Sequence, residues 1–310
     1  MRILIVGAGS VGGYFGGRLL EAKRDVTFLL RRRRAEQLRQ TGLVIRSKAG
    51  DLHLPSPPHT LAETISEPFD LVIVACKAYH LVQTMESFAP AVGSETAILP
   101  LLNGMGHLDL LSARFGESRV LGGVCLISSV LDPNGAIVHL NEVHKLIFGE
   151  RDGSRSARID SIAKALDGAI FHSQASTDIL QEMWEKWIFI AAAAGITCLM
   201  RGTIGEIAAA GAAGLATRLY EECSAIARGA GYPPRPAAVQ RSVAILTAPG
   251  SDLTASMFRD MESGGQTEAD QIVGELIRRG GAPGVERVLD IAYSHLKVYE
   301  SRRVQAHSIN

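Results

Sequence analysis

A net charge of either sign is absent from this sequence. Its 310 residues include 32 Lys and Arg and 32 Asp and Glu, so the formal charge at neutral pH is zero. This balance favours neither a polyanion nor an anionic membrane surface as the general partner, and we expect no nucleic-acid binding. A disordered chain is excluded as well, because hydrophobic residues make up 46% and charged residues 21%. At this length we expect two cores.

Cysteine is scarce and scattered. The four cysteines lie far apart, at Cys76, Cys125, Cys198 and Cys223. Without a CxxC pair they argue against a structural zinc site and against a disulfide framework. The nine histidines include no HExxH motif, and His139 and His144 are five residues apart, so we expect no metal site.

Long apolar runs are also missing. No stretch of about 18 uninterrupted apolar residues occurs, as a membrane span would require. The apolar run at residues 3–6 ends in glycines and is too short for the core of a signal sequence. We therefore expect a cytoplasmic protein that does not bind a membrane.

The sequence does contain a strand-helix-strand pattern at its N-terminus. Residues 3–6 are apolar, a glycine turn follows, residues 11–22 favour a helix, and residues 26–30 form a second apolar run. The apolar runs at 70–77 and 96–104 are typical of central parallel strands. We expect an α/β fold with a doubly wound parallel sheet of the Rossmann type, which the β-like segments after residue 119 extend.

The second half of the chain has a different texture. Alanine-rich stretches with helical periodicity cover residues 178–200, 203–230, 237–248 and 267–280. The segment Thr267 to Asp270 has the spacing of a helix N-cap. We therefore predict a nucleotide-binding domain over residues 1–172, followed by an all-α domain over residues 173–310.

The first turn of the chain has the GxGxxG pattern. Gly7 permits a tight turn, Gly9 lets the backbone approach a pyrophosphate, and Gly12 allows close helix packing, while the helix N-terminus attracts phosphate. A glycine turn without a ligand is the alternative interpretation. The pattern predicts a dinucleotide site formed by the six residues Gly7, Ala8, Gly9, Ser10, Val11 and Gly12.

Arginine stands where NAD-binding proteins carry an acidic residue. The second strand runs into Arg31, Arg32, Arg33 and Arg34, without an Asp or Glu at its end. A guanidinium there can pair with a 2′-phosphate, which favours NADPH over NADH. Alternatively, the run is a solvated helix start, which we expect for two or three of the four arginines but least for Arg31.

Several motifs together resemble the ketopantoate reductase (2-dehydropantoate 2-reductase) family. They are "GAGSVGGYFGGRL", "LVIVACKAYH", "NGMG", "WEKW" and "TASM" followed by "QTEAD", and they span nearly the whole chain. The resemblance implies an NADPH-binding Rossmann domain joined to a helical domain, and reduction of a 2-oxo acid. It also implies a place in pantothenate biosynthesis.

The resemblance also assigns residues. It implies that Arg31 and Lys77 contact the adenosine phosphate of the cofactor and that Asn103 lies near the nicotinamide and the substrate. Lys186 would be the catalytic lysine. Glu268 would act on the substrate at the catalytic centre, and Ser256 would bind the substrate. On the residues alone, Lys77 and Lys186 can also be surface lysines, Asn103 a turn residue, and Glu268 a carboxylate favoured by a helix dipole.

One departure from the family concerns the helix of Lys186. The family places asparagines four and eight residues after the lysine, where this chain has Ile190 and Ala194. These spacings share the lysine's helix face, whereas Thr197 lies about 16 Å along the axis and is too far to replace them. We therefore keep open a reductase of a more apolar 2-oxo acid or ketone, and a non-catalytic NADPH sensor. A homodimer also stays open.

Overall fold

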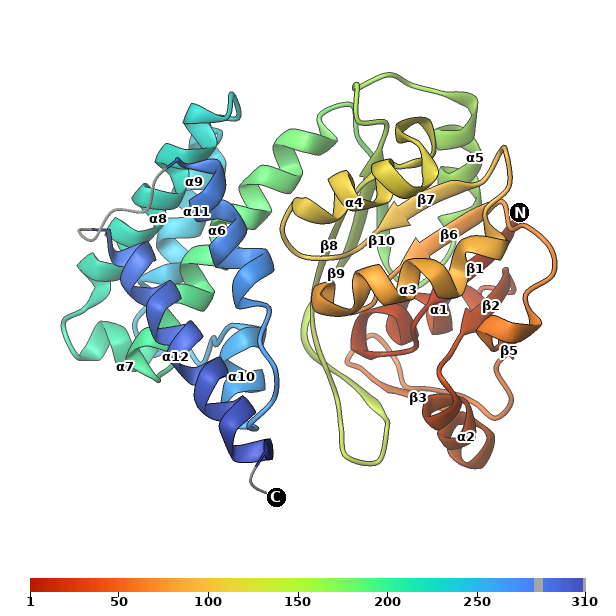
Figure 1. The fold of residues 1–310 in the computed structure, drawn as a ribbon, viewed down its shortest axis with the longest axis horizontal. Helices are drawn as coiled ribbons and strands as arrows, with labels where there is room; N and C mark the ends of the chain where they lie inside the picture. The colour runs from red at the N-terminus through yellow and green to blue at the C-terminus, as the bar shows by residue number, and fades with distance from the viewer. Residues whose placement is uncertain (282–286, 309–310) are drawn as a thin grey trace. The chain divides into compact units, whose positions relative to one another are not determined.

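The chain forms two compact units in this computed structural model, which describes residues 1–281 and 287–308 (Figure 1). Unit 1 consists of Met1–Leu102 and His107–Leu180, and unit 2 consists of Asn103–Gly106 and the chain from Gln181 onward. The sequence places the domain boundary at residue 172. In the structure, unit 1 continues beyond that residue because strand β10 (His172–Ala175) pairs with β9 (Ile137–Gly149).

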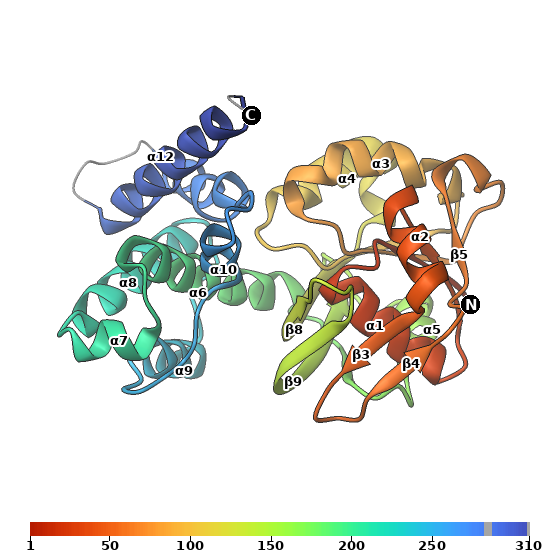
Figure 2. The ribbon, with the colours of Figure 1, turned by 90° about the horizontal axis from the view of Figure 1, so that it is seen from below.

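Unit 1 contains a five-stranded parallel sheet in the order β5-β2-β1-β6-β7. Its strands are β1 (Arg2–Val6), β2 (Asp25–Leu29), β5 (His59–Thr60), β6 (Leu71–Val74) and β7 (Ala97–Pro100). The helices of this unit are α1 (Ser10–Glu21), α2 (Arg32–Thr41), α3 (Leu81–Phe88), α4 (Gly106–Phe115) and α5 (Ala157–Leu166). Figure 2 shows α3 and α4 on one face of this sheet and α1 on the other, which confirms the predicted doubly wound sheet.

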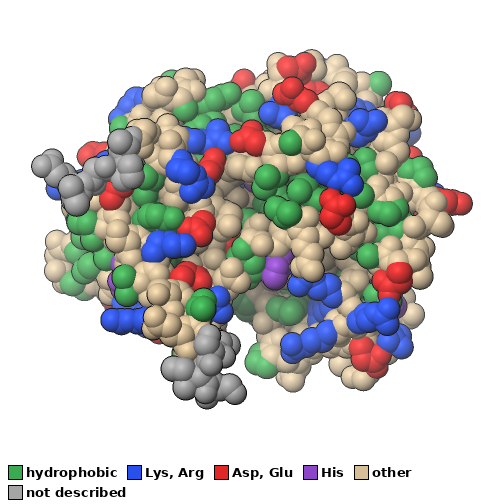
Figure 3. Space-filling view, viewed as in Figure 1, with side chains coloured by type: hydrophobic (Ala, Val, Ile, Leu, Met, Phe, Trp, Pro, Cys, Tyr) green, Lys and Arg blue, Asp and Glu red, His purple; other side chains and the backbone are tan. Residues whose placement is uncertain are grey.

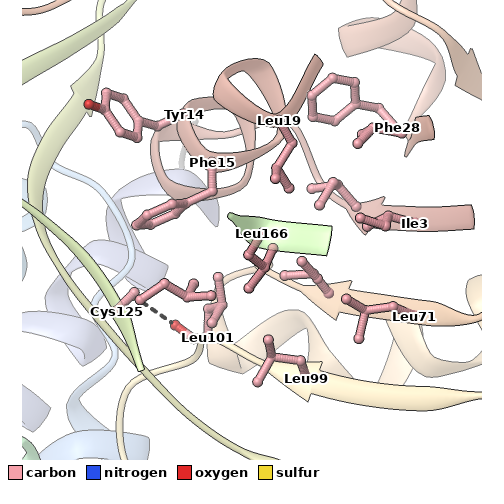
Figure 4. Close-up of a cluster of buried hydrophobic side chains, with 14 of the residues drawn as sticks. Ile3, Tyr14, Phe15, Leu19, Phe28, Leu71, Leu99, Leu101, Cys125 and Leu166 are labelled. Carbon is pink, nitrogen blue, oxygen red and sulfur yellow. Dashed lines mark hydrogen bonds between the residues drawn. The ribbon is translucent and has the colours of Figure 1, made fainter. Parts of the chain in front are cut away.

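The core of unit 1 lies between the parallel sheet and its helices. Phe15 of α1 and Leu166 of α5 belong to one buried cluster with Leu71 of β6 and Leu99 of β7 (Figure 4). Cys125 is buried there and its Sγ donates to the carbonyl of Leu101 at 3.5 Å. Both apolar runs are buried, as the sequence indicated, but only β6 is a central strand, because β7 is the last strand in the sheet order.

The later β-segments do not extend the first sheet, so that prediction was wrong. The strands β3 (Leu43–Arg46), β4 (Leu52–Leu54), β8 (Gly122–Leu131), β9 and β10 form a second sheet, in which β8 pairs with β9 in antiparallel register. A single bridge between Ile98 and Val120 joins the start of this region to β7. The ten-residue β8 and thirteen-residue β9 pair with each other instead, because a short turn connects them.

Helix α1 packs against both sheets, as Figure 2 shows. A Cβ on Gly16 would lie 2.5 Å from the ring of Phe28 in the first sheet, and a Cβ on Gly13 would lie 2.5 Å from Cδ1 of Ile137 in the second. Real Cβ atoms do not approach so closely, so a larger residue would displace the buried ring of Phe28 at Gly16 and the end of the Ile137 side chain at Gly13. The repeated glycines of "GSVGGYFGGRL" therefore let one helix contact two sheets.

Unit 2 is helical, as predicted, and the structure shows no strand in its described part. Its helices are α6 (Ile179–Met200), α7 (Ile204–Ala209), α8 (Ala213–Gly229), α9 (Pro236–Leu246), α10 (Ser256–Glu262), α11 (Glu275–Arg279) and α12 (Val288–Ser308), with a π-helix at Asp270–Gly274. By length and composition alone α6 could cross a membrane, but 72% of its most apolar window is buried. Such burial is typical of a core helix.

Candidate active site

The glycine loop joins β1 to α1. Gly7 has φ +97°, a conformation that favours glycine, and a Cβ on Gly12 would lie 2.1 Å from the carbonyl oxygen of Gly7. By contrast, a Cβ on Gly9 would meet no atom within 4 Å. Gly9 is the N-cap of α1 without a side-chain cap, and the first turn holds no acidic residue. Open space above free N–H groups at a helix start fits a pyrophosphate.

The four arginines after β2 have different surroundings. Arg31 is the exposed N-cap of α2, and Arg32 pairs with Glu63 on the surface. Arg34 is half-buried: its Nε donates to the carbonyl of Ala8 at 3.0 Å, and its Nη2 donates to the carbonyl of Gly135 at 3.1 Å. Arg34 therefore holds the glycine loop itself. Sequence reasoning missed this role, because no motif signals a side chain that binds backbone carbonyls.

The segment after β6 lies close to the first of these arginines. Lys77 is half-buried and is the N-cap of the short 3₁₀ helix Ala78–His80. Burial, and after it the charge of Arg31, hold the pKa of His80 below its usual value. Because β2 and β6 flank β1, their carboxyl ends bring these side chains to the edge that carries the glycine loop. Lys and Arg side chains also gather over α2 on the surface shown in Figure 3.

A second set of predicted site residues belongs to unit 2. Asn103 is half-buried and begins the turn of the "NGMG" motif. Gly104 has φ +82°, and a Cβ there would lie 2.5 Å from the carbonyl oxygen of Gln271. The turn that carries Asn103 therefore rests on the backbone of the π-helix Asp270–Gly274.

Lys186 and Glu268 lie on elements that are directly bonded to each other. Lys186 is half-buried in α6, and the indole Nε1 of the next residue, Trp187, donates to the carbonyl of Ile272 at 2.8 Å. The N–H of Ile272 in turn donates to the carbonyl of Glu268 at 2.9 Å. Glu268 is only 5% exposed. The structure thus brings the helix of the lysine against the segment of the glutamate.

The start of the glutamate segment differs from the sequence prediction. Thr267 does not act as an N-cap: its N–H and its hydroxyl both donate to Oε1 of Glu300 on α12, at 2.6 and 2.7 Å. The helical geometry begins two to three residues later, at the π-helix whose N-cap is Ala269. A distant carboxylate was available to this threonine, and local spacing cannot reveal such a partner. Ser256 is exposed as the first residue of α10.

Glu185, beside the lysine, is a structural residue that the sequence did not indicate. Its carboxylate is 9% exposed and accepts hydrogen bonds from the backbone N–H and the guanidinium of Arg235 and from Gln181. Burial would raise the pKa of Glu185, but the hydrogen bonds with Arg235 hold it below its ordinary value. Trp184 stacks on Tyr232, with ring centroids 5.5 Å apart. The "GYPPRP" turn is therefore fixed against α6.

The positions that depart from the family pattern lie along α6. Ile190 is half-buried and Ala194 is 2% exposed. Thr197 is fully buried, and its hydroxyl donates to the carbonyl of Ala193 at 2.6 Å. The hydroxyl proton of Thr197 is thus used within α6 itself.

Comparison with known proteins identifies the family. The family model "Ketopantoate reductase PanE/ApbA" matches residues 3–153, and the model of its C-terminal region matches residues 178–300. The chain is 41% identical to the uncharacterized oxidoreductase YkpB of Bacillus subtilis, over 98% of this chain and 100% of that protein.

Solved structures show the same fold. The crystal structure of 2-dehydropantoate 2-reductase from Geobacter metallireducens is 29% identical, with a TM-score of 0.87 over 96% of this chain and 99% of that one. A D-mandelate dehydrogenase with NADH and anilino(oxo)acetate is 19% identical, with a TM-score of 0.86 over 98% and 99% of the two chains. With both units matched and a nicotinamide-type glycine loop in place, this chain is an oxidoreductase that belongs to the ketopantoate reductase family.

Proposed function

We propose that the protein reduces a 2-oxo acid to a 2-hydroxy acid with NADPH, with 2-dehydropantoate to pantoate as the leading case. This activity would place it in pantothenate biosynthesis and in the cytoplasm. The observation that carries the proposal is the bonded contact between the helix of Lys186 and the segment of Glu268, through Trp187 and Ile272. Two ionisable side chains in neighbouring elements of one unit suit proton transfer and substrate orientation.

The residues divide the chemistry among them. When bound, the reduced nicotinamide supplies a hydride to the ketone carbon. Lys186 gives a proton to the ketone oxygen, or polarises it, as negative charge develops there. Asn103 and Glu268 orient the substrate through hydrogen bonds, and Ser256 holds its carboxylate.

The choice of NADPH rests on the residues after β2 and β6. Arg31 is exposed at the end of the strand and the chain has no carboxylate in that place to bind ribose hydroxyls. Lys77 and His80 lie at the neighbouring strand end. A guanidinium and an ammonium at one edge suit a 2′-phosphate, and the six residues from Gly7 to Gly12 hold the pyrophosphate.

The identity of the 2-oxo acid depends on α6. Ile190 and Ala194 offer no hydrogen bond to a substrate hydroxyl, and an unpaired polar group typically costs about 1 to 3 kcal/mol. A more apolar 2-oxo acid, or a ketone, is therefore the second candidate substrate class. Because Ala194 is 2% exposed, Ile190 is the position at which a substitution can change this preference with less disturbance of the core.

The proposal is tested by following NADPH oxidation by absorbance with a panel of 2-oxo acids that includes 2-dehydropantoate. We expect Lys186→Ala to lower kcat by about 10² to 10⁴ and to leave NADPH affinity unchanged. Lys164→Ala, which removes an exposed lysine of α5, is the matched control and should retain the parental kcat. Glu268→Ala should mainly raise KM.

Two outcomes would contradict the proposal. If the protein binds NADPH but reduces no member of the panel, a sensor becomes the better interpretation. If Lys186→Ala turns over as fast as Lys164→Ala, the lysine is not the proton donor.

A further inference from the structure

A π-helix begins two residues after Glu268. Residues Asp270–Gly274 have π geometry and α11 continues from Glu275. A π turn contains one residue more than an α turn, so it rotates the residues before it relative to those after it. The direction of Glu268 relative to α11 is therefore determined by this short segment.

Three elements of unit 2 contact the π-helix. From α12, the hydroxyl of Tyr293 donates to Asp270 at 2.6 Å and the ammonium of Lys297 donates to it at 2.9 Å. Gly104, next to Asn103, packs on the carbonyl of Gln271. From α6, the indole of Trp187 donates to the carbonyl of Ile272. The elements that carry Asn103, Lys186 and Glu268 thus share one backbone segment as their support.

The bond from Trp187 links the helix of the lysine to the segment that follows the glutamate. Trp187 is 1% exposed, directly follows Lys186 and binds a carbonyl four residues after Glu268. The indole N–H thus adds a directional bond between the α6 helix and the backbone of the π-helix, which packing of the ring alone would not supply. A phenylalanine ring could fill most of that space but could not donate the bond.

We propose that Trp187 is a positioning residue, which fixes Lys186 relative to Glu268 through the Ile272 carbonyl of the π-helix. This inference rests on the proposed function of that lysine and that glutamate. Because productive geometry must be held within a fraction of an ångström, loss of the bond should slow the chemical step while cofactor binding is unchanged.

Trp187→Phe tests the proposal, with Trp184→Phe as the matched control. Both changes replace a buried indole of α6, and the two rings pack against each other with centroids 4.9 Å apart, but of the two only Trp187 donates to Ile272. On the most active 2-oxo acid, we expect Trp187→Phe to lower kcat about tenfold to a hundredfold. NADPH affinity should stay within about twofold, and the pH at which kcat is half-maximal should shift. Trp184→Phe should lower the melting temperature similarly and leave kcat and its pH profile unchanged.

The outcomes separate this inference from the proposed function. If Lys186→Ala is inactive but Trp187→Phe and Trp184→Phe have equal kcat values and equal pH profiles, Trp187 only fills the core and the inference is wrong. If Lys186→Ala is fully active, the proposed function fails first.

A second pair of variants approaches the π-helix from the other side and covers the case that Trp187→Phe does not fold. Gly104→Ala should displace the Gln271 carbonyl and lower kcat, because its Cβ would lie 2.5 Å from that oxygen. Gly106→Ala, whose Cβ would lie 3.4 Å from the flexible side chain of Glu275, should keep the parental kcat. Equal kcat values for these two variants would overturn the role of the π-helix as a shared support.

Discussion

Replacing Arg34 by alanine should weaken both the fold and cofactor binding, and the size of the effect follows from its contacts. The side chain donates to the carbonyls of Ala8 and Gly135 from a half-buried position. A buried hydrogen bond from a charged donor contributes about 1.5 to 3 kcal/mol. Because water can replace part of each bond at a half-exposed site, we expect the free energy of unfolding to fall by about 1 to 2 kcal/mol. Arg33→Ala removes an exposed arginine of the same helix and should change it by less than about 0.5 kcal/mol.

The effect of Arg34→Ala on the cofactor should be independent of the 2′-phosphate. The Ala8 carbonyl belongs to the loop that would hold the pyrophosphate, which NADPH and NADH share. We expect both dissociation constants to rise by the same factor, about three- to tenfold, which corresponds to about 0.6 to 1.4 kcal/mol. Fluorescence titration with each cofactor and urea unfolding would measure these changes. If only NADPH binding weakened, Arg34 would bind the 2′-phosphate directly. If Arg34→Ala and Arg33→Ala had the same dissociation constants and the same free energy of unfolding, the contacts of Arg34 would not stabilise the glycine loop.

Three further predictions address the cofactor, the substrate and pH. The unmodified protein should bind NADPH at least about tenfold more tightly than NADH, and Arg31→Ala should narrow that ratio in the same titrations; equal affinities at the outset would contradict it. Activity on 2-dehydropantoate should be weak relative to an analogue with an alkyl group in place of the hydroxymethyl, and Ile190→Asn should shift kcat/KM back toward 2-dehydropantoate; a parental kcat/KM above about 10⁴ M⁻¹s⁻¹ on 2-dehydropantoate would show that other residues hold the hydroxyl. The hydrogen bond from Arg158 holds the pKa of Glu150 below its ordinary value of 4.5. The stabilisation that the ionised Glu150 provides is therefore complete above pH 4.5 and is lost as the pH falls through the lowered pKa. The free energy of unfolding of Glu150→Gln, measured with urea, should accordingly depend less on pH in the acidic range. An unchanged pH dependence would show that the Glu150–Arg158 pair does not cause it.

Local patterns in the sequence predicted the elements of the fold well. The apolar runs and the glycine turn gave β1, α1, β2, β6 and β7, because buried parallel strands and an amphipathic helix each have their own periodicity. The sheet that β8 and β9 join could not be predicted in the same way. Which sheet a strand joins depends on pairing between distant residues, such as Ile45 with Ile137, and single-sequence periodicity carries no information about it.

The candidate site shows the same division. The motifs placed Lys186 and Glu268 in the chain, but not the bond from Trp187 to the Ile272 carbonyl that brings their elements together. Thr267 has the spacing of an N-cap, yet its hydroxyl donates to the carboxylate of Glu300, 33 residues away. Contacts of side chains with backbone carbonyls or with far carboxylates leave no periodic trace, so only the structure reveals them.

The two-sided packing of α1 limits how this enzyme can be divided or recombined. The first 102 residues contain the whole parallel sheet and the glycine loop. The strand that packs on Gly13 is β9, which begins at Ile137. A fragment that ended after β7 would keep β3 and β4 against Gly17 but would leave Gly13 without the contact of Ile137 and Tyr14 without its hydrogen bond to His144. In a chimera, the β8-β9 hairpin must therefore accompany the glycine loop, so the smallest transferable cofactor module of this chain extends to at least Gly149, the end of β9.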